Sequence, residues 1–174
     1  MEIKLNKFVF KLDFSFIILL SFAVFYGYKS TVSIILFSFL HELGHLLALL
    51  IFKVKPELIK VSFYGVGLKY KNNLSKIKEF IVLICGPLVN LLLYLFLKDE
   101  INLILFLINI FPALPLDGGR IIKLIIPKYS KGISLFFIII LSSLSAYLFI
   151  EYNIFSLILI SIYLIAFNLM EKNN

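Results

Sequence analysis

The sequence predicts an all-α polytopic membrane protein: six transmembrane helices, with a small membrane-associated β-hairpin between the second and the third. The 174 residues are 61% hydrophobic, with a mean hydropathy of +1.05, whereas soluble domains are roughly 45–50% apolar. Apolar runs of about 18 or more residues recur along the chain, as bilayer-crossing helices require. No polar stretch long enough for a separate soluble domain is left over, so residues 1–174 are expected to form a single transmembrane domain.

The six predicted spans follow a short lead-in. Residues 1–13 alternate charged and apolar side chains, which favours a short interfacial strand or an irregular segment. Gly86-Pro87 in the third span predicts a kink, and the prolines and glycines between Pro112 and Gly119 interrupt the fourth span. Irregular backbone at membrane depth survives only where protein buries it or where it lines a cavity. The spans cover residues 14–28, 30–52, 77–97, 101–126, 132–150 and 154–170.

A polar, lysine-rich stretch at residues 53–78 separates the second and third spans. Residues 58–64 and 66–70 alternate apolar and polar side chains, and Gly65 and Gly67 lie at the break between them. This pattern favours a β-hairpin at the membrane surface, and the alternative is a featureless cytoplasmic loop.

Positive charge is distributed unevenly across the predicted topology. Six spans place both termini on one side, together with fifteen of the seventeen Lys and Arg residues; only Lys29 and Lys98 fall on the other side. The positive-inside bias therefore predicts cytoplasmic termini. The lysines behind the net charge of +7 are distributed between the spans rather than clustered. The lipid bilayer, and no nucleic acid, is therefore the expected partner.

The first apolar run, residues 14–28, lacks the small-residue cleavage site of a signal peptide and is expected to be retained as a span. The single cysteine, Cys85, excludes an internal disulfide.

The second span carries the run His41-Glu42-Leu43-Gly44-His45. On a helix this spacing puts both histidines on one face, with Cβ atoms roughly 5–6 Å apart. Two neutral imidazoles so placed can bind one Zn²⁺, and the glutamate between them can act as general base. Ionisable groups inside an apolar span are costly and therefore mark a function. The alternative is a pair of hydrogen-bonded core histidines.

A zinc site needs a third protein ligand, and Asp117 is the only other acidic residue at membrane depth. At 1.5 Å per residue, His41 and His45 lie about 15–22 Å below the start of their span, and Asp117 lies at most about 24 Å below the start of the fourth span. The three side chains are thus expected at one level, with Asp117 as third ligand. The alternative is that Asp117 pairs with Arg120 near the interface.

Three runs of the chain carry a resemblance to a known family: HELGH, Gly86-Pro87-x-x-Asn90, and Asn109 followed by Pro115-Leu116-Asp117-Gly118. Together they resemble the site-2 proteases, a family of intramembrane zinc metalloproteases. The six-span layout without a PDZ insertion is most similar to the branch of sporulation stage IV protein FB, which often carries a CBS domain that is not expected here.

The resemblance implies one Zn²⁺ per chain, held by His41, His45 and Asp117, with Glu42 as the catalytic base. Asn109 matches a family asparagine near the active site, which implies a role in substrate binding. Residues 63–67 are similar to the family's proline-phenylalanine-glycine-glycine hairpin, which adds Gly65 and Gly67 as candidate substrate-binding residues, although the proline is missing and one residue separates the glycines.

The implied function is that of a zinc metalloendopeptidase of the bacterial cell membrane, acting in regulated intramembrane proteolysis and in sporulation. Its expected substrate is a membrane-tethered protein cut near the cytoplasmic face, and a membrane-bound regulatory protein is a further candidate partner. Two alternatives stay open: a membrane metal-binding or transport protein without protease activity, and a catalytically silent scaffold.

Overall fold

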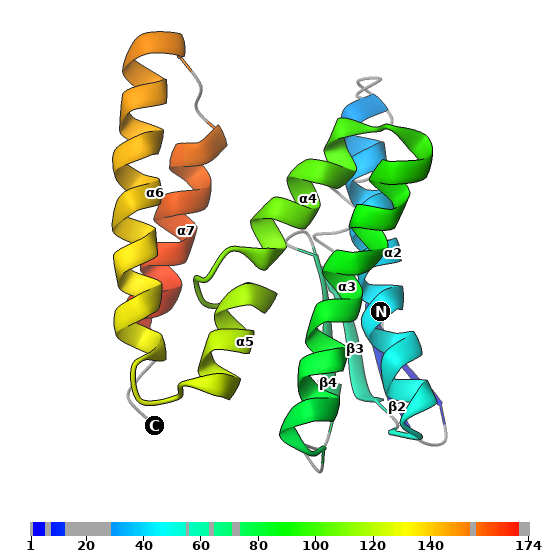
Figure 1. The fold of residues 1–174 in the computed structure, drawn as a ribbon. Coiled ribbons are helices and arrows are strands. Elements are labelled where there is room, and N and C mark those ends of the chain that lie inside the picture. Colours follow the sequence, from blue (N-terminus) through cyan, green and yellow to red (C-terminus); the bar gives the residue numbers. More distant parts are fainter. Residues whose placement is uncertain are drawn as a thin grey trace. The chain divides into compact units, whose positions relative to one another are not determined.

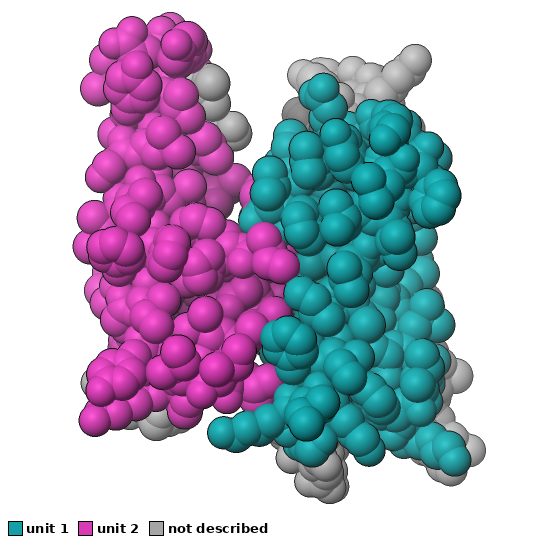
Figure 2. All heavy atoms as spheres, in the orientation of Figure 1, with its two compact units in different colours: residues 1–107 teal, residues 108–174 magenta. Residues whose placement is uncertain are grey.

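The computed structural model describes residues 2–5, 8–12, 29–54, 56–62, 65–70, 74–153 and 156–170. The chain divides into two compact units, residues 1–107 (unit 1) and residues 108–174 (unit 2), coloured separately in Figure 2. The expectation that residues 1–174 form a single domain stays a prediction.

Unit 1 is built on two long apolar helices, α2 (Lys29–Ile51) and α3 (Lys76–Leu97), which pack against each other (Figure 1). Ala48, Leu49 and Val82 form the buried core of this helix pair. Pro87 lies inside α3, which continues through it. These helices correspond closely to the second and third predicted spans.

Unit 1 also contains a four-stranded sheet. The strands are β1 (Glu2–Leu5), β2 (Phe8–Leu12), β3 (Pro56–Ser62) and β4 (Gly65–Tyr70), in the order β1-β2-β3-β4. The β3 and β4 strands pair antiparallel, at the place where the sequence predicts a hairpin; residues 63–64 between them lie outside the described residues. The β2 strand pairs parallel with β3, so the N-terminal lead-in joins the predicted hairpin in a mixed sheet, and the described sheet has two strands more than the sequence predicts.

The fourth predicted span is interrupted, as its prolines and glycines indicate. Helix α4 (Glu100–Ile110) begins in unit 1 and ends in unit 2, and α5 (Asp117–Ile125) follows after an irregular loop at residues 111–116. In unit 2, α6 (Ser130–Tyr152) packs against both α5 and α7 (Ser156–Met170), as Figure 1 shows for α6 and α7. A core of Ala113, Ile138 and Leu164 joins the loop to α6 and α7.

Within the described residues, three helices are long and apolar enough to cross a membrane: Thr31–Ile51, Lys76–Leu97 and Ser130–Tyr152. Two shorter apolar helical stretches, Glu100–Ile110 and Ile160–Leu169, match parts of the fourth and sixth predicted spans. The first predicted span, residues 14–28, lies outside the described residues. The number of six spans therefore stays a prediction.

Many large apolar side chains of the described residues are exposed, and several polar side chains are buried beside the apolar cores. Polar residues such as Asn90, Ser134 and Asn168 are almost completely buried, whereas Phe96 and Ile150 are 82% and 77% exposed. Lipid solvates exposed apolar side chains, and buried polar side chains join helices by hydrogen bonds where no water is present. This distribution supports a membrane protein.

Candidate metal centre

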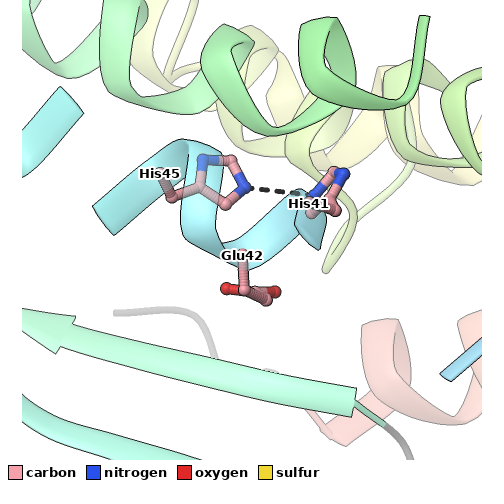
Figure 3. A group of neighbouring side chains, drawn as sticks. All are labelled: His41, Glu42 and His45. Carbon is pink, nitrogen blue, oxygen red and sulfur yellow. Dashed lines mark hydrogen bonds between the residues drawn. The ribbon is translucent and has the colours of Figure 1, made fainter. Parts of the chain in front are cut away.

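His41 and His45 lie one turn apart on α2, on the same side of the helix, as Figure 3 shows. Both side chains are buried, at 4% and 5% exposure. The prediction that both histidines lie on one face of a helix is confirmed, and the two imidazoles meet in an apolar environment.

The two rings face each other through their Nε2 atoms, which are 3.1 Å apart. Two nitrogens bound to one zinc at about 2.0–2.1 Å in tetrahedral geometry lie about 3.3–3.4 Å apart. The observed separation is within a few tenths of an ångström of that value. Without a metal, the same separation suits one N–H···N hydrogen bond.

Groups of α3 contact the Nδ1 atom of each ring and so orient both rings. The Nδ1 atom of His45 lies 2.7 Å from the backbone carbonyl oxygen of Val82. Because a carbonyl oxygen only accepts, Nδ1 donates, and in the neutral ring Nε2 keeps its lone pair for a metal. The Nδ1 atom of His41 lies 3.1 Å from the side-chain amide of Asn90, which is completely buried.

The amide of Asn90 suits a metal-binding His41 as well as a metal-free one. With its nitrogen toward Nδ1, as in the structure, its Oδ1 atom has no hydrogen-bond partner among the described residues. With its oxygen turned toward Nδ1, the amide accepts the ring N–H and leaves Nε2 of His41 with a lone pair. Asn90 can therefore support the tautomer that zinc binding requires.

Gly86 of α3 leaves space beside both metal-facing nitrogens. A Cβ atom at this position would lie 2.7 Å from Nε2 of His41 and closer still to Nε2 of His45. The backbone of α3 therefore approaches both rings at a point where only glycine fits. This space, two buried ring nitrogens and their orienting partners together fit a bound zinc ion.

Glu42 completes the local group. His41, Glu42 and His45 each offer a ligand-type atom, and these atoms lie within 4.8 Å of one another. Figure 3 shows the three side chains on one stretch of α2. Glu42 is partly exposed, unlike the two histidines.

Asp117, the predicted third ligand, begins α5 and is 6% exposed. Its Oδ1 atom lies 3.4 Å from Nη1 of Arg120, longer than the roughly 2.7–2.9 Å of a charge-assisted hydrogen bond. The alternative pairing with Arg120 is thus present, as a long contact to a partly exposed side chain. Asp117 and Asn109 belong to unit 2 and the histidines to unit 1, so ligation by Asp117 and substrate binding by Asn109 stay predictions.

The two glycines predicted to bind substrate both lie in β4. Gly65 pairs with Ser62, and Gly67 pairs with Lys60. The β4 strand is the last in the described sheet and packs against α2. Their role in substrate binding stays a prediction.

Sequence reasoning named Asn90 only as part of a motif and missed its contact with His41, as well as that of Val82 with His45. The signal for Asn90 was available: a polar residue inside an apolar span, one turn after Gly86 and therefore on the same face of α3. The Val82 contact has no such signal, because any residue supplies a backbone carbonyl.

No family model matches the chain. A protein of Synechocystis sp. with the provisional name zinc metalloprotease is 34% identical over an alignment of 107 positions, and the match covers 49% of this chain and 28% of that protein. The chain thus spans less than a third of the length of this curated relative. The site-2 protease from Methanocaldococcus jannaschii matches with a TM-score of 0.64 and 24% identity, over 100% of this chain and 95% of that one.

The chain has a site-2 protease fold. This structural similarity agrees with the resemblance to site-2 proteases that the HELGH run and the run ending in Asp117-Gly118 indicate. The finer resemblance to the sporulation branch stays a prediction.

Proposed function

We propose that this protein is an intramembrane zinc metalloendopeptidase. The observation that carries the proposal is the pair of buried imidazoles on α2, with Nε2 atoms 3.1 Å apart and Glu42 between them in the sequence. Burying such a pair inside an apolar helix costs free energy, so its presence indicates a function. The site-2 protease fold and the similarity to a named zinc metalloprotease support the same reading.

One zinc ion per chain is the proposed cofactor. Nε2 of His41, Nε2 of His45 and a carboxylate oxygen of Asp117 would hold it, which leaves the open position of a catalytic zinc site. When bound, zinc supplies a Lewis acid that polarises the scissile carbonyl and lowers the pKa of water. Val82 and Asn90 hold the two rings in the orientation that this role needs.

Glu42 is the proposed general base. Its carboxylate takes a proton from the attacking water and then passes it to the amine that leaves. The Glu42 side chain is less buried than those of the two histidines. Two of the three proposed ligands and the proposed base thus come from one turn of α2.

The proposed substrate is a membrane-associated or membrane-spanning protein that is cut near the cytoplasmic face. A helical substrate hides its carbonyls in its own hydrogen bonds, so it must be extended to react. The β4 strand, which packs against α2, is the proposed template on which an extended segment adds as a further strand. In this proposal Gly65, Gly67 and Asn109 contact the substrate, the termini are cytoplasmic, and cleavage belongs to regulated intramembrane proteolysis in a bacterial cell.

A metal transporter would need ligand groups along a route through the membrane. Among the described residues, His41, Glu42 and His45 form the only group of three or more ligand-type side chains. The observed site therefore favours a catalytic centre over a transport path.

The test is Glu42→Gln, measured for both bound zinc and cleavage of a membrane-tethered reporter. The proposal predicts unchanged zinc content and a loss of cleavage by about 10²–10⁴-fold, as expected for removing a general base. Glu151→Gln, which changes an exposed glutamate at the end of α6, is the matched control. Retained cleavage in Glu42→Gln would remove this residue as the base.

A further inference from the structure

The loop at residues 111–116 connects α4 to Asp117 and belongs to neither a helix nor a strand. We propose that Ser134 of α6 and Asn168 of α7 are positioning residues, which hold this loop so that Asp117 meets the metal. The inference rests on the proposed function, in which Asp117 is a zinc ligand. It assigns a role in the metal centre to two helices that supply none of the proposed ligands.

Ser134 and Asn168 satisfy both backbone polar groups of one loop residue. The N–H of Leu114 donates to Oγ of Ser134 at 2.9 Å, and the carbonyl of Leu114 accepts from Nδ2 of Asn168 at 2.8 Å. All three residues are buried, at 4%, 1% and 1% exposure. In a membrane an irregular segment has no water to bond with, so these two side chains supply what a helix would otherwise supply.

The two side chains are also fixed to each other. Oγ of Ser134 donates to Oδ1 of Asn168 at 3.0 Å, and Nδ2 of Asn168 makes a second bond to the carbonyl of Leu164 at 3.0 Å. Every hydrogen of the hydroxyl and of the amide thus has a partner. A fully satisfied buried network of this kind has one preferred geometry, so it holds Leu114 in one place.

The held backbone is coupled to the start of α5. A Cβ atom on Gly119 would lie 2.6 Å from the carbonyl oxygen of Ala113 and closer still to the nitrogen of Leu114. The N–H of Leu116 bonds to the carbonyl of Ala113 at 2.9 Å. Asp117 therefore follows a loop that packs directly against its own helix, and we expect a displacement of Leu114 to shift the Asp117 carboxylate. Zinc sites tolerate only about ±0.2 Å in their bond lengths.

The experiment compares zinc affinity in Ser134→Ala and Asn168→Leu with that of the unchanged protein, in detergent, by competition with a chromophoric chelator. The expected result is a rise of about 10-fold in the zinc Kd for Ser134→Ala and up to about 100-fold for Asn168→Leu, as for other residues that orient a ligand. Hydrogen exchange of residues 111–116 in zinc-free protein should become faster in both variants, which tests the hold on the loop without metal or activity.

Ser145→Ala is the matched control. Ser145 lies on the same helix, is also buried at 2% exposure, and bonds to α7 through Oγ of Ser161 at 3.3 Å. Its zinc Kd should not change. An equal rise in the control would overturn the inference, because the effect would then come from loosened packing between α6 and α7.

Asp117→Ala separates this inference from the proposed function. If this variant loses zinc affinity while Ser134→Ala and Asn168→Leu keep it, the positioning role is wrong and the protease proposal stands. If Asp117→Ala keeps full affinity, the ligand assignment fails and the positioning role fails with it. Should Asn168→Leu not fold, as judged by thermal unfolding, Ser134→Ala decides alone, since it removes a single hydroxyl.

Discussion

Gly86→Ala probes the metal centre most sharply, because it adds one methyl group where α3 meets both histidine rings. The new Cβ atom would lie 2.7 Å from Nε2 of His41 and closer to Nε2 of His45, whereas ordinary contacts begin near 3.4 Å. Both rings must therefore move by roughly 0.7 Å or more, beyond the ±0.2 Å or so that zinc bonds tolerate. We expect the zinc Kd to rise by about 100-fold, the upper end of the range for disturbed ligand geometry.

The fold should survive this substitution. Alanine is favoured over glycine inside a helix by roughly 0.5–1 kcal/mol, which offsets part of the cost of moving the rings. The assay is a chelator competition for zinc, paired with thermal unfolding of the zinc-free protein. Gly132→Ala in α6 is the matched control, since a Cβ atom there would meet nothing within 4 Å. If the Gly86→Ala protein folds and keeps full zinc affinity, the claim that zinc binds in the space beside Gly86 is wrong.

Three further predictions concern the same centre. Asn90→Leu should raise the zinc Kd by about 10–100-fold, because His41 loses the group that orients its ring, and a chelator competition measures this change. Arg120→Leu should leave the zinc Kd unchanged, since the Arg120–Asp117 contact is long and partly exposed; a large fall in the Kd would show that Arg120 competes with zinc for Asp117 and would favour the ion pair as the main role of this carboxylate. Removing zinc by dialysis against a chelator should abolish reporter cleavage, and added zinc should restore it, whereas cleavage by the metal-free protein would exclude a metalloprotease.

Local patterns in the sequence predicted the elements that carry the site. The apolar runs at residues 30–52 and 77–97 correspond to α2 and α3 within one residue at each end. The prolines and glycines after Phe111 predicted the break between α4 and α5. The spacing of His41 and His45 predicted two rings on one face, because that geometry depends on the helix alone.

Contacts between distant segments could not be predicted in this way. The parallel pairing of β2 with β3 joins residues on either side of the first two predicted spans, and neither strand signals its partner. The contact between Asn168 and Leu114 spans 54 residues and uses a backbone carbonyl, which every residue has. Asp117 shows the same limit: its residue type suggests a ligand, but the ligation proposed for it requires a contact between two units of the chain, which no local pattern predicts.

X-ray absorption at the zinc edge of the purified, zinc-loaded protein tests the central claim most directly. The account predicts two imidazole nitrogens and at least one oxygen at about 2.0–2.2 Å, with that oxygen shell altered in Asp117→Ala. A sulfur neighbour at about 2.3 Å, which only Cys85 or a methionine could supply, or a spectrum without imidazole scattering, would contradict it.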